Sequence, residues 1–177
     1  MGFAHMEADL RREHILNMIR QKDTPVSASL LAKTLNVSRQ AIVGDIALLR
    51  AQGSEIIATA RGYMIPEFKE TNRYVGKVAC RHTPENTKAE LYAMVDLEAE
   101  VINIIVEHEI YGEITGSLNI TARDDVDVFI NKIDASDVRL LSELTMGVHL
   151  HTVACRDKAH FDEVCRALDD CGYLHKN

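Results

Sequence analysis

The sequence predicts an α+β protein built from two modules, and two observations support this. Up to residue 66, apolar residues recur at helical spacing and are followed by two short β-type runs. From residue 73 onward, strand-like and helix-like segments follow the order β-α-β-β-α-β, with one further helix. We therefore expect domains at residues 1–66 and 73–177, joined by a short polar linker over residues 67–72.

The composition is that of an ordinary globular protein, with 177 residues, 46% hydrophobic residues and a net charge of −7. The charge is uneven, because residues 1–65 carry eight Lys/Arg against six Asp/Glu while the rest is strongly acidic. Such asymmetry suggests two modules with different partners. The sequence shows no signal peptide, no apolar run near the roughly 18 residues that span a bilayer, and no C-x-x-C pair. We expect a reduced, cytoplasmic protein that does not bind membranes.

The first module reads as three helices and a β-hairpin. Apolar spacing defines each helix, Ser27 or Ser29 can cap the second, and Ser38 stands at the N-cap position of the third. Gly53 stops the third helix. The expected elements are helices over 10–19 and 39–50, a short helix between them that carries Leu30, Leu31 and Leu35, and strands over 55–59 and 62–65.

This order is typical of a winged helix-turn-helix, in which the second helix of the helix-turn-helix pair enters the DNA major groove. Arginine pairs with guanine and glutamine with adenine, and a residue at the wing tip can meet a phosphate or the minor groove. A three-helix scaffold that binds no DNA is the alternative. The predicted DNA-contacting residues are Ser38, Arg39, Gln40, Asp45 and Arg61.

The second module is predicted as a split βαβ arrangement, a variant of the ferredoxin-like fold. Thr83-Pro84-Glu85 has the composition of a helix start, and Gly172 closes the last helix. The expected strands cover 74–80, 101–106, 114–120 and 148–154, and the expected helices cover 83–97, 124–133, a short turn at 138–144, and 158–171.

Two histidines alternate with aliphatic residues in Gly147–Thr152, so His149 and His151 share one face of a strand. The expected sheet order, 4-1-3-2 in the module's own strand numbering, sets the last strand antiparallel beside the first. This brings His82, at the end of the first strand, toward the histidine pair. His108 ends the second strand, roughly three strand spacings of ~4.8 Å away, and is ranked lower as a ligand.

A carboxylate would complete the ligand set. Glu90 lies about two turns into the helix after His82, and its rivals are Glu85, Glu98 and Glu107. Three imidazoles and a carboxylate suit zinc, nickel or iron. An alternating strand with two exposed histidines is the alternative, and Cys80 reads as a buried thiol rather than a ligand.

Several motifs together resemble the niacin-responsive transcriptional repressors of Gram-positive and related bacteria, and the second module resembles their three-histidine (3H) domain. The resemblance covers nearly the whole chain. The matching motifs are Val37–Ile46, Ile57–Tyr63, His82–Glu85 with Glu90, Glu107–Gly112 and Gly147–Thr152.

The resemblance implies a homodimeric repressor of genes for niacin uptake and NAD synthesis, with nicotinic acid as co-repressor. It also implies a divalent transition metal at His82, Glu90, His149 and His151, with the niacin pocket near that metal. The chain departs from the family at two positions. Ile110 stands where the family more often has Pro, and Gly44 where it more often has Gln.

Within the matched motifs, His108 and Tyr111 are candidate ligand-binding residues. Three rival interpretations remain: a metal-dependent hydrolase with Glu107 or Glu85 as general base, a sensor of another small anion, and a zinc-stabilised structural domain.

Overall fold

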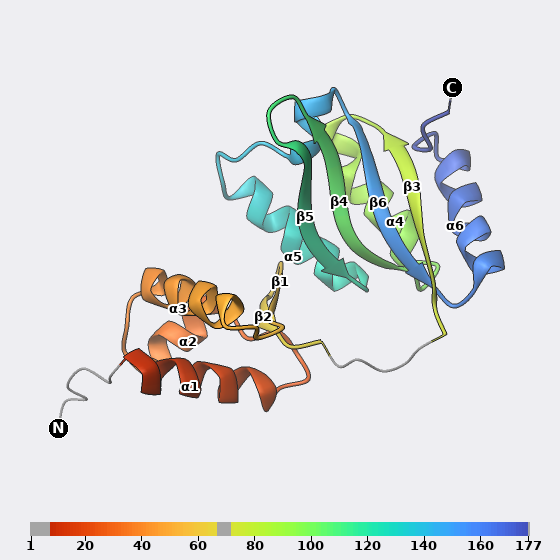
Figure 1. Ribbon diagram of the computed structural model, residues 1–177. Helices are drawn as coiled ribbons and strands as arrows, with labels where there is room; N and C mark the ends of the chain where they lie inside the picture. The colour runs from red at the N-terminus through yellow and green to blue at the C-terminus, as the bar shows by residue number, and fades with distance from the viewer. Residues whose placement is uncertain (1–7, 67–71, 177) are drawn as a thin grey trace. The chain divides into compact units, whose positions relative to one another are not determined.

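The computed structural model describes residues 8–66 and 72–176 (Figure 1). The chain divides into two compact units, Met1–Lys69 and Glu70–Asn177. The predicted linker at 67–72 falls almost wholly outside the described residues. Among the described helices, none is long and apolar enough to cross a membrane.

The first unit has the predicted order of elements. Ser27 Oγ accepts from the backbone N–H of Leu30, and Ser38 Oγ from that of Ala41, both at 3.1 Å, so each serine caps its helix. The first strand was predicted to begin at residue 55 but begins at residue 57, because Glu55 and Ile56 lie before the residues that pair with the second strand. The elements are α1(Ala8–Arg20), α2(Ala28–Leu35), α3(Arg39–Ala51), β1(Ile57–Thr59) and β2(Gly62–Met64).

The three helices and the hairpin share one hydrophobic core. Each helix contributes residues spaced three or four apart, as an amphipathic helix requires. Val26, between α1 and α2, exchanges two backbone hydrogen bonds with Tyr63, which ties the hairpin to the helices. The buried core residues are Ile15, Ile19, Val26, Ala28, Leu31, Ala32, Leu35, Ile42, Ile46, Leu49 and Ile56.

The second unit keeps the predicted β-α-β-β-α-β-α order, which confirms the α+β fold class. The helix predicted over 83–97 is shorter than expected, because its first turn is a separate 3₁₀ helix (η1) over Pro84–Asn86. The remaining elements are β3(Tyr74–Arg81), α4(Thr87–Val95), β4(Glu100–His108), β5(Gly112–Ile120), α5(Arg123–Asp134), η2(Leu141–Thr145), β6(Val148–Cys155) and α6(Lys158–Asp170).

The sheet is fully antiparallel, with the order β3-β6-β4-β5 (Figure 1). In the module's own numbering this is 1-4-2-3, so the expected order 4-1-3-2 is wrong. The expected pairing of the last strand with the first is correct. The uncharged β6 is central, as expected for a strand buried on both sides, but β4 is also central although it carries Glu100 and Glu107, so strand charge alone does not account for the order.

One face of the sheet packs against the helices. Alternate strand residues enter a core shared with α4, α5 and α6, and Phe161 of α6 lies directly against Gly76. The buried members of this core are Val78, Cys80, Leu91, Met94, Val95, Ala99, Val101, Leu118, Ile120, Val126, Val153, Cys155, Phe161, Val164 and Leu168. The histidine pair of β6 points toward this same helical layer.

Candidate metal centre and DNA-facing helix

Four side chains predicted as ligands lie together on the helical face of the sheet. His82 follows β3, Glu90 lies in the first turn of α4, and His149 and His151 belong to β6. The cluster is inaccessible to solvent, with Glu90 1%, His149 3% and His151 2% exposed. Strand pairing brings the histidines together, because Cys80 pairs with His149 and the chain continues directly to His82.

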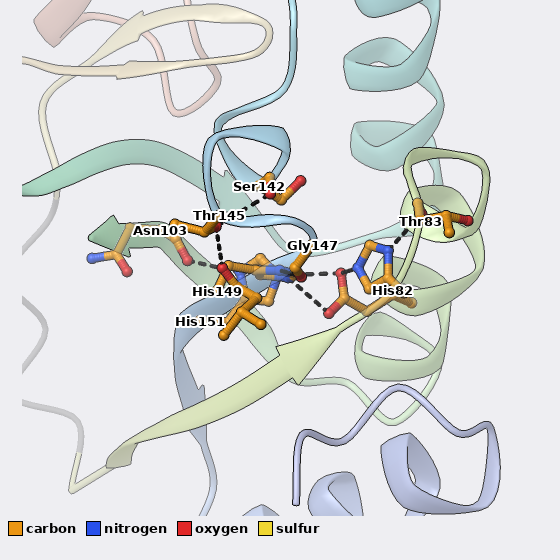
Figure 2. A network of polar contacts seen from close by, with 10 residues as sticks. His82, Thr83, Asn103, Ser142, Thr145, Gly147, His149 and His151 are labelled. Atoms are coloured by element: carbon orange, nitrogen blue, oxygen red, sulfur yellow. Dashed lines mark hydrogen bonds and ion pairs between the residues drawn. The ribbon is translucent and has the colours of Figure 1, made fainter. Parts of the chain in front are cut away.

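The three histidine side chains converge on the Glu90 carboxylate, and Figure 2 shows His82, His149 and His151 on the same side of the sheet. His82 Nε2 lies 2.7 Å from Glu90 Oε2, His149 Nε2 lies 3.1 Å from Oε1, and His151 Nε2 lies 3.3 Å from Oε2. The Nε2 atoms of His149 and His151 are themselves 3.1 Å apart. We call these four residues the histidine–glutamate cluster.

Backbone carbonyls determine which nitrogen of each of the three rings carries the hydrogen. His82 Nδ1 lies 2.8 Å from the carbonyl oxygen of Thr83. His149 Nδ1 lies 2.9 Å from that of Gly147, and His151 Nδ1 2.9 Å from that of Asn103. A carbonyl oxygen can only accept, so each Nδ1 carries the hydrogen and donates it. In the neutral ring, Nε2 is then left with a lone pair that faces Glu90.

The cluster is therefore a set of acceptors without a donor. Three Nε2 lone pairs and a carboxylate face one another, and the buried His82 Nε2 makes no hydrogen bond although it lies 2.7 Å from Glu90 Oε2. By contrast, both ring nitrogens of the buried His160 are satisfied, one by the Leu97 carbonyl at 2.5 Å and one by the Arg156 N–H at 3.1 Å. A divalent transition metal fits this set, since metal-bound histidines usually donate the other N–H to a carbonyl.

The pKa shifts of Glu90 and His82 indicate that the cluster attracts positive charge. Burial raises the pKa of Glu90, but the His149, His151 and His82 rings that face its carboxylate outweigh burial and hold that pKa well below its usual range. Burial lowers the pKa of His82, but the Glu90 carboxylate outweighs this, and the net pKa is raised. The carboxylate is ionised and attracts a cation, whether a proton or a metal ion.

Cys80 borders the cluster. Its Sγ, a Glu90 carboxylate oxygen and a His149 nitrogen lie within 4.8 Å of one another. Burial, and then the neighbouring Glu90 charge, raise the pKa of the Cys80 thiol. The sequence predicted a buried thiol at this position, and the structure has one beside the cluster.

The other predicted ligand-site residues lie elsewhere. His108 belongs to β4, which neighbours β6, so the strand distance given for its lower rank is wrong. Its ring instead turns into the β4–β5 hairpin, where Nδ1 accepts from the N–H of Ile110 at 3.2 Å. It stacks near Tyr111, with ring centroids 5.1 Å apart. Within the described residues, neither ring has a recorded contact with the histidine–glutamate cluster.

The three rival carboxylates are exposed. Glu85 lies in η1, Glu98 pairs with Arg156 at 3.1 Å, and Glu107 lies on the face of β4 opposite to the cluster. Among the described residues, Glu90 is the carboxylate recorded in contact with the three histidines.

The predicted DNA-facing residues divide between two environments. Arg39 and Gln40 are exposed in the first turn of α3, directly after the capping Ser38, and Arg61 is exposed in the β1–β2 turn. Asp45 is only 3% exposed on the inward side of α3. Its carboxylate is engaged by Arg11 of α1, with Nε 2.6 Å from Oδ2, so here Asp45 ties two helices together.

Sequence reasoning missed some supporting groups. Arg11 and Arg12, which flank the Asp45 carboxylate, stand in the first helix and gave no sign of their partner. The carbonyls of Thr83, Asn103 and Gly147 were also missed. Backbone acceptors leave no trace in side-chain identity, and only the positive φ of +88° at Gly147 has a signal in the sequence, the glycine itself.

Comparisons with known proteins match a family to each half of the chain. Residues 11–64 match an HTH domain family and residues 75–177 match the 3H domain family. The chain is 38% identical over 169 residues to the transcription repressor NadR of Bacillus subtilis, covering 94% of each protein. It is 37% identical over 164 residues to the probable transcription repressor NiaR of Thermotoga maritima, covering 93% of each.

Proposed function

Because the chain belongs to the NadR/NiaR family of transcription repressors, which join an HTH domain to a 3H domain, we propose that it represses genes for niacin uptake and NAD synthesis. Nicotinic acid acts as co-repressor in this proposal, and a homodimer binds operator DNA. The motifs that resemble niacin-responsive repressors, above all Gly147–Thr152, support the choice of effector.

We further propose that His82, Glu90, His149 and His151 hold a divalent transition metal, with nickel, zinc and iron as candidates. The observation that carries this proposal is the convergence of three Nε2 lone pairs on one buried carboxylate. A bound metal would supply a Lewis-acidic cation that attracts a small anion.

The effector and the DNA-binding heads must be coupled for repression to respond to niacin. Nicotinate is a planar anion, and the second unit is acidic, so a local cation would offset the repulsion between them. A ligand shifts an equilibrium only by its difference in affinity for the two states. Nicotinate therefore has to favour the arrangement of the dimer that fits the operator. His108 and Tyr111 remain candidates for additional contacts with the effector.

On the DNA side, we propose that the N-terminal turn of α3 reads base edges, with Arg39 and Gln40 as the specifying side chains. Ser38 caps that turn, and Arg61 meets the backbone or the minor groove from the wing. Asp45 acts indirectly, because its contact with Arg11 sets the angle of α3 against α1.

A metal-dependent hydrolase is not favoured by any specific observation. Its proposed general bases, Glu85 and Glu107, are exposed and away from the cluster, and the relatives are named as transcription repressors.

A mobility-shift titration tests the proposal. Metal-loaded protein is titrated into DNA from its own upstream region and from niacin-transport promoters, with and without nicotinic acid. We expect at least tenfold tighter binding with nicotinic acid. The His149→Ala/His151→Ala variant should lose metal retention and the niacin response, and keep basal DNA binding. The exposed His175→Ala in the same unit serves as the matched control and should behave as wild type.

Two results would contradict the proposal in different ways. An unchanged niacin response in the double variant would remove the cluster from effector sensing. DNA binding that ignores nicotinic acid in the wild type would redirect the search to another small anion.

A further inference from the structure

The sheet of the second unit has a face that takes no part in the helical core. It consists of the alternate strand residues that point away from the cluster. None of these residues belongs to the core shared with α4, α5 and α6. We call this surface the outer face, and its central members are Lys77, Ala79, Arg81, Ile105, Glu107, Glu113, Thr115, Val148, Leu150 and Thr152.

Strand register arranges these residues in rows across the sheet. One row runs Ala79, Leu150, Ile105 and Thr115, so its centre is aliphatic, with Ala79 and Leu150 half-buried and Ile105 only 5% exposed. In the next row, Arg81 stands beside Val148 on β3 and β6, and Glu107 stands beside Glu113 on β4 and β5. The second row therefore has a cation at one edge and two carboxylates at the other.

The two carboxylates destabilise the sheet of a single chain. Glu107 and Glu113 are direct cross-strand partners, and like charges in that position repel. Arg81 is about three strand spacings, or ~14 Å, from Glu113, beyond the reach of its side chain. Among the described residues, no salt bridge is recorded for Arg81, Glu107 or Glu113. A monomer leaves this repulsion uncompensated.

A second copy of the chain supplies the missing charges by symmetry. A two-fold axis parallel to the strands, running between β6 and β4, places each β3 opposite the β5 of the other copy. Rows then meet the same rows, so Arg81 faces Glu113 of the second copy and Leu150 faces its Ile105. An axis perpendicular to the strands sets β3 on β3 and produces no such match.

We propose that the outer face is the surface through which two copies of the chain associate, packed sheet on sheet with Arg81 opposite Glu113. This inference deepens the proposed function, since it rests on the homodimer assumed there. Four strands at ~4.8 Å and about eight residues at ~3.3 Å cover on the order of 500 Å² per copy. The total of roughly 1,000 Å² reaches the lower limit for specific interfaces, and two sheets pack this way at ~10 Å.

Charge reversal tests the interface in the full-length, metal-loaded protein. Sedimentation velocity without DNA measures the dimer dissociation constant of wild type, Arg81→Glu, Glu113→Arg and the double variant. We expect each single reversal to weaken the dimer roughly tenfold or more, because like charges then face each other. The double reversal restores the pair with opposite sign and should return to within about threefold of wild type.

Matched controls lie on the helical side of the unit. Arg166→Glu and Glu163→Arg reverse exposed charges on α6 and should leave association unchanged. Circular dichroism and metal content confirm that each variant is folded, and the double reversal guards against a variant that merely unfolds.

The possible outcomes separate this inference from the proposed function. Single reversals that leave the dimer intact, or a double reversal that fails to restore it, overturn the outer face as the interface. A wild-type protein that is monomeric at all concentrations overturns it together with the homodimer of the proposed function. In each of these cases the niacin response remains separately measurable by mobility shift.

Discussion

Gly147 is the residue on which the geometry of the cluster most depends. Its φ is +88°, and a Cβ at this position would lie 2.2 Å from the carbonyl oxygen of His82. Its own carbonyl accepts from His149. Gly147→Ala should therefore destabilise the second unit by at least about 2 kcal/mol and weaken metal binding. Urea unfolding and calorimetric metal titration measure the two effects.

Gly172 provides the matched control for that substitution. It also has a positive φ, +76°, but a Cβ there would meet nothing within 4 Å. Gly172→Ala should cost only the backbone strain, about 1 kcal/mol, and leave metal affinity unchanged. Equal losses in both variants would show that the close approach to His82 is unimportant.

At the scale of single residues, the sequence predicted which side chains converge but not the groups that orient them. His82, Glu90, His149 and His151 converge as expected, because the inference needed only residue spacing and one strand pairing. Asp45 shows the opposite case. Its position on α3 suggested a DNA contact, but the side that a helical residue faces depends on its packing partners, here Arg11.

Helices α4 and α5 are joined by a group of surface charges. Arg123 Nη2 lies 2.5 Å from Asp96 Oδ2, and Asp127 Oδ1 lies 2.7 Å from Lys88 Nζ and 2.6 Å from the Tyr92 hydroxyl. Arg123 lowers the pKa of Asp96, and Lys88 followed by Tyr92 lowers that of Asp127. A carboxyl group whose pKa is lowered by folding stabilises the folded state at pH values above its unfolded pKa of about 4. That contribution disappears as the pH falls through the folded pKa.

The stability difference between wild type and Asp96→Asn/Asp127→Asn should therefore be largest above pH ~5 and shrink toward zero below pH ~4. Urea unfolding of both proteins at a series of pH values measures it, and the subtraction removes groups common to both. The exposed Asp137→Asn is the control and should show no such trend. A difference that is constant with pH would mean that these charges do not couple the helices.

Element order was predictable because helix caps and apolar periodicity are local. Ser38 was expected as a cap, and either Ser27 or Ser29 as another; Ser38 and Ser27 accept the capping backbone hydrogen bonds. Strand order was harder to predict, because it depends on which strands can be buried on both sides. The charges of β3 and β6 match their observed places, but the central β4 carries Glu100 and Glu107, so strand charge alone did not predict the order.

At the scale of the whole molecule, each unit has its own hydrophobic core, and the proposed metal belongs to only one of them. A ligand that binds only the native state stabilises that state, by about 2.7 kcal/mol at 100 times its dissociation constant. Removal of the metal by a chelator should therefore increase amide exchange in α4 and β6, whose residues hold it, and leave α3 unchanged. Hydrogen exchange with mass spectrometry resolves these segments.

Nickel or zinc should restore the lost protection, whereas magnesium should not, because it prefers oxygen ligands. Equal deprotection of α3 would instead mean that the two units unfold as one and that the metal stabilises the entire chain.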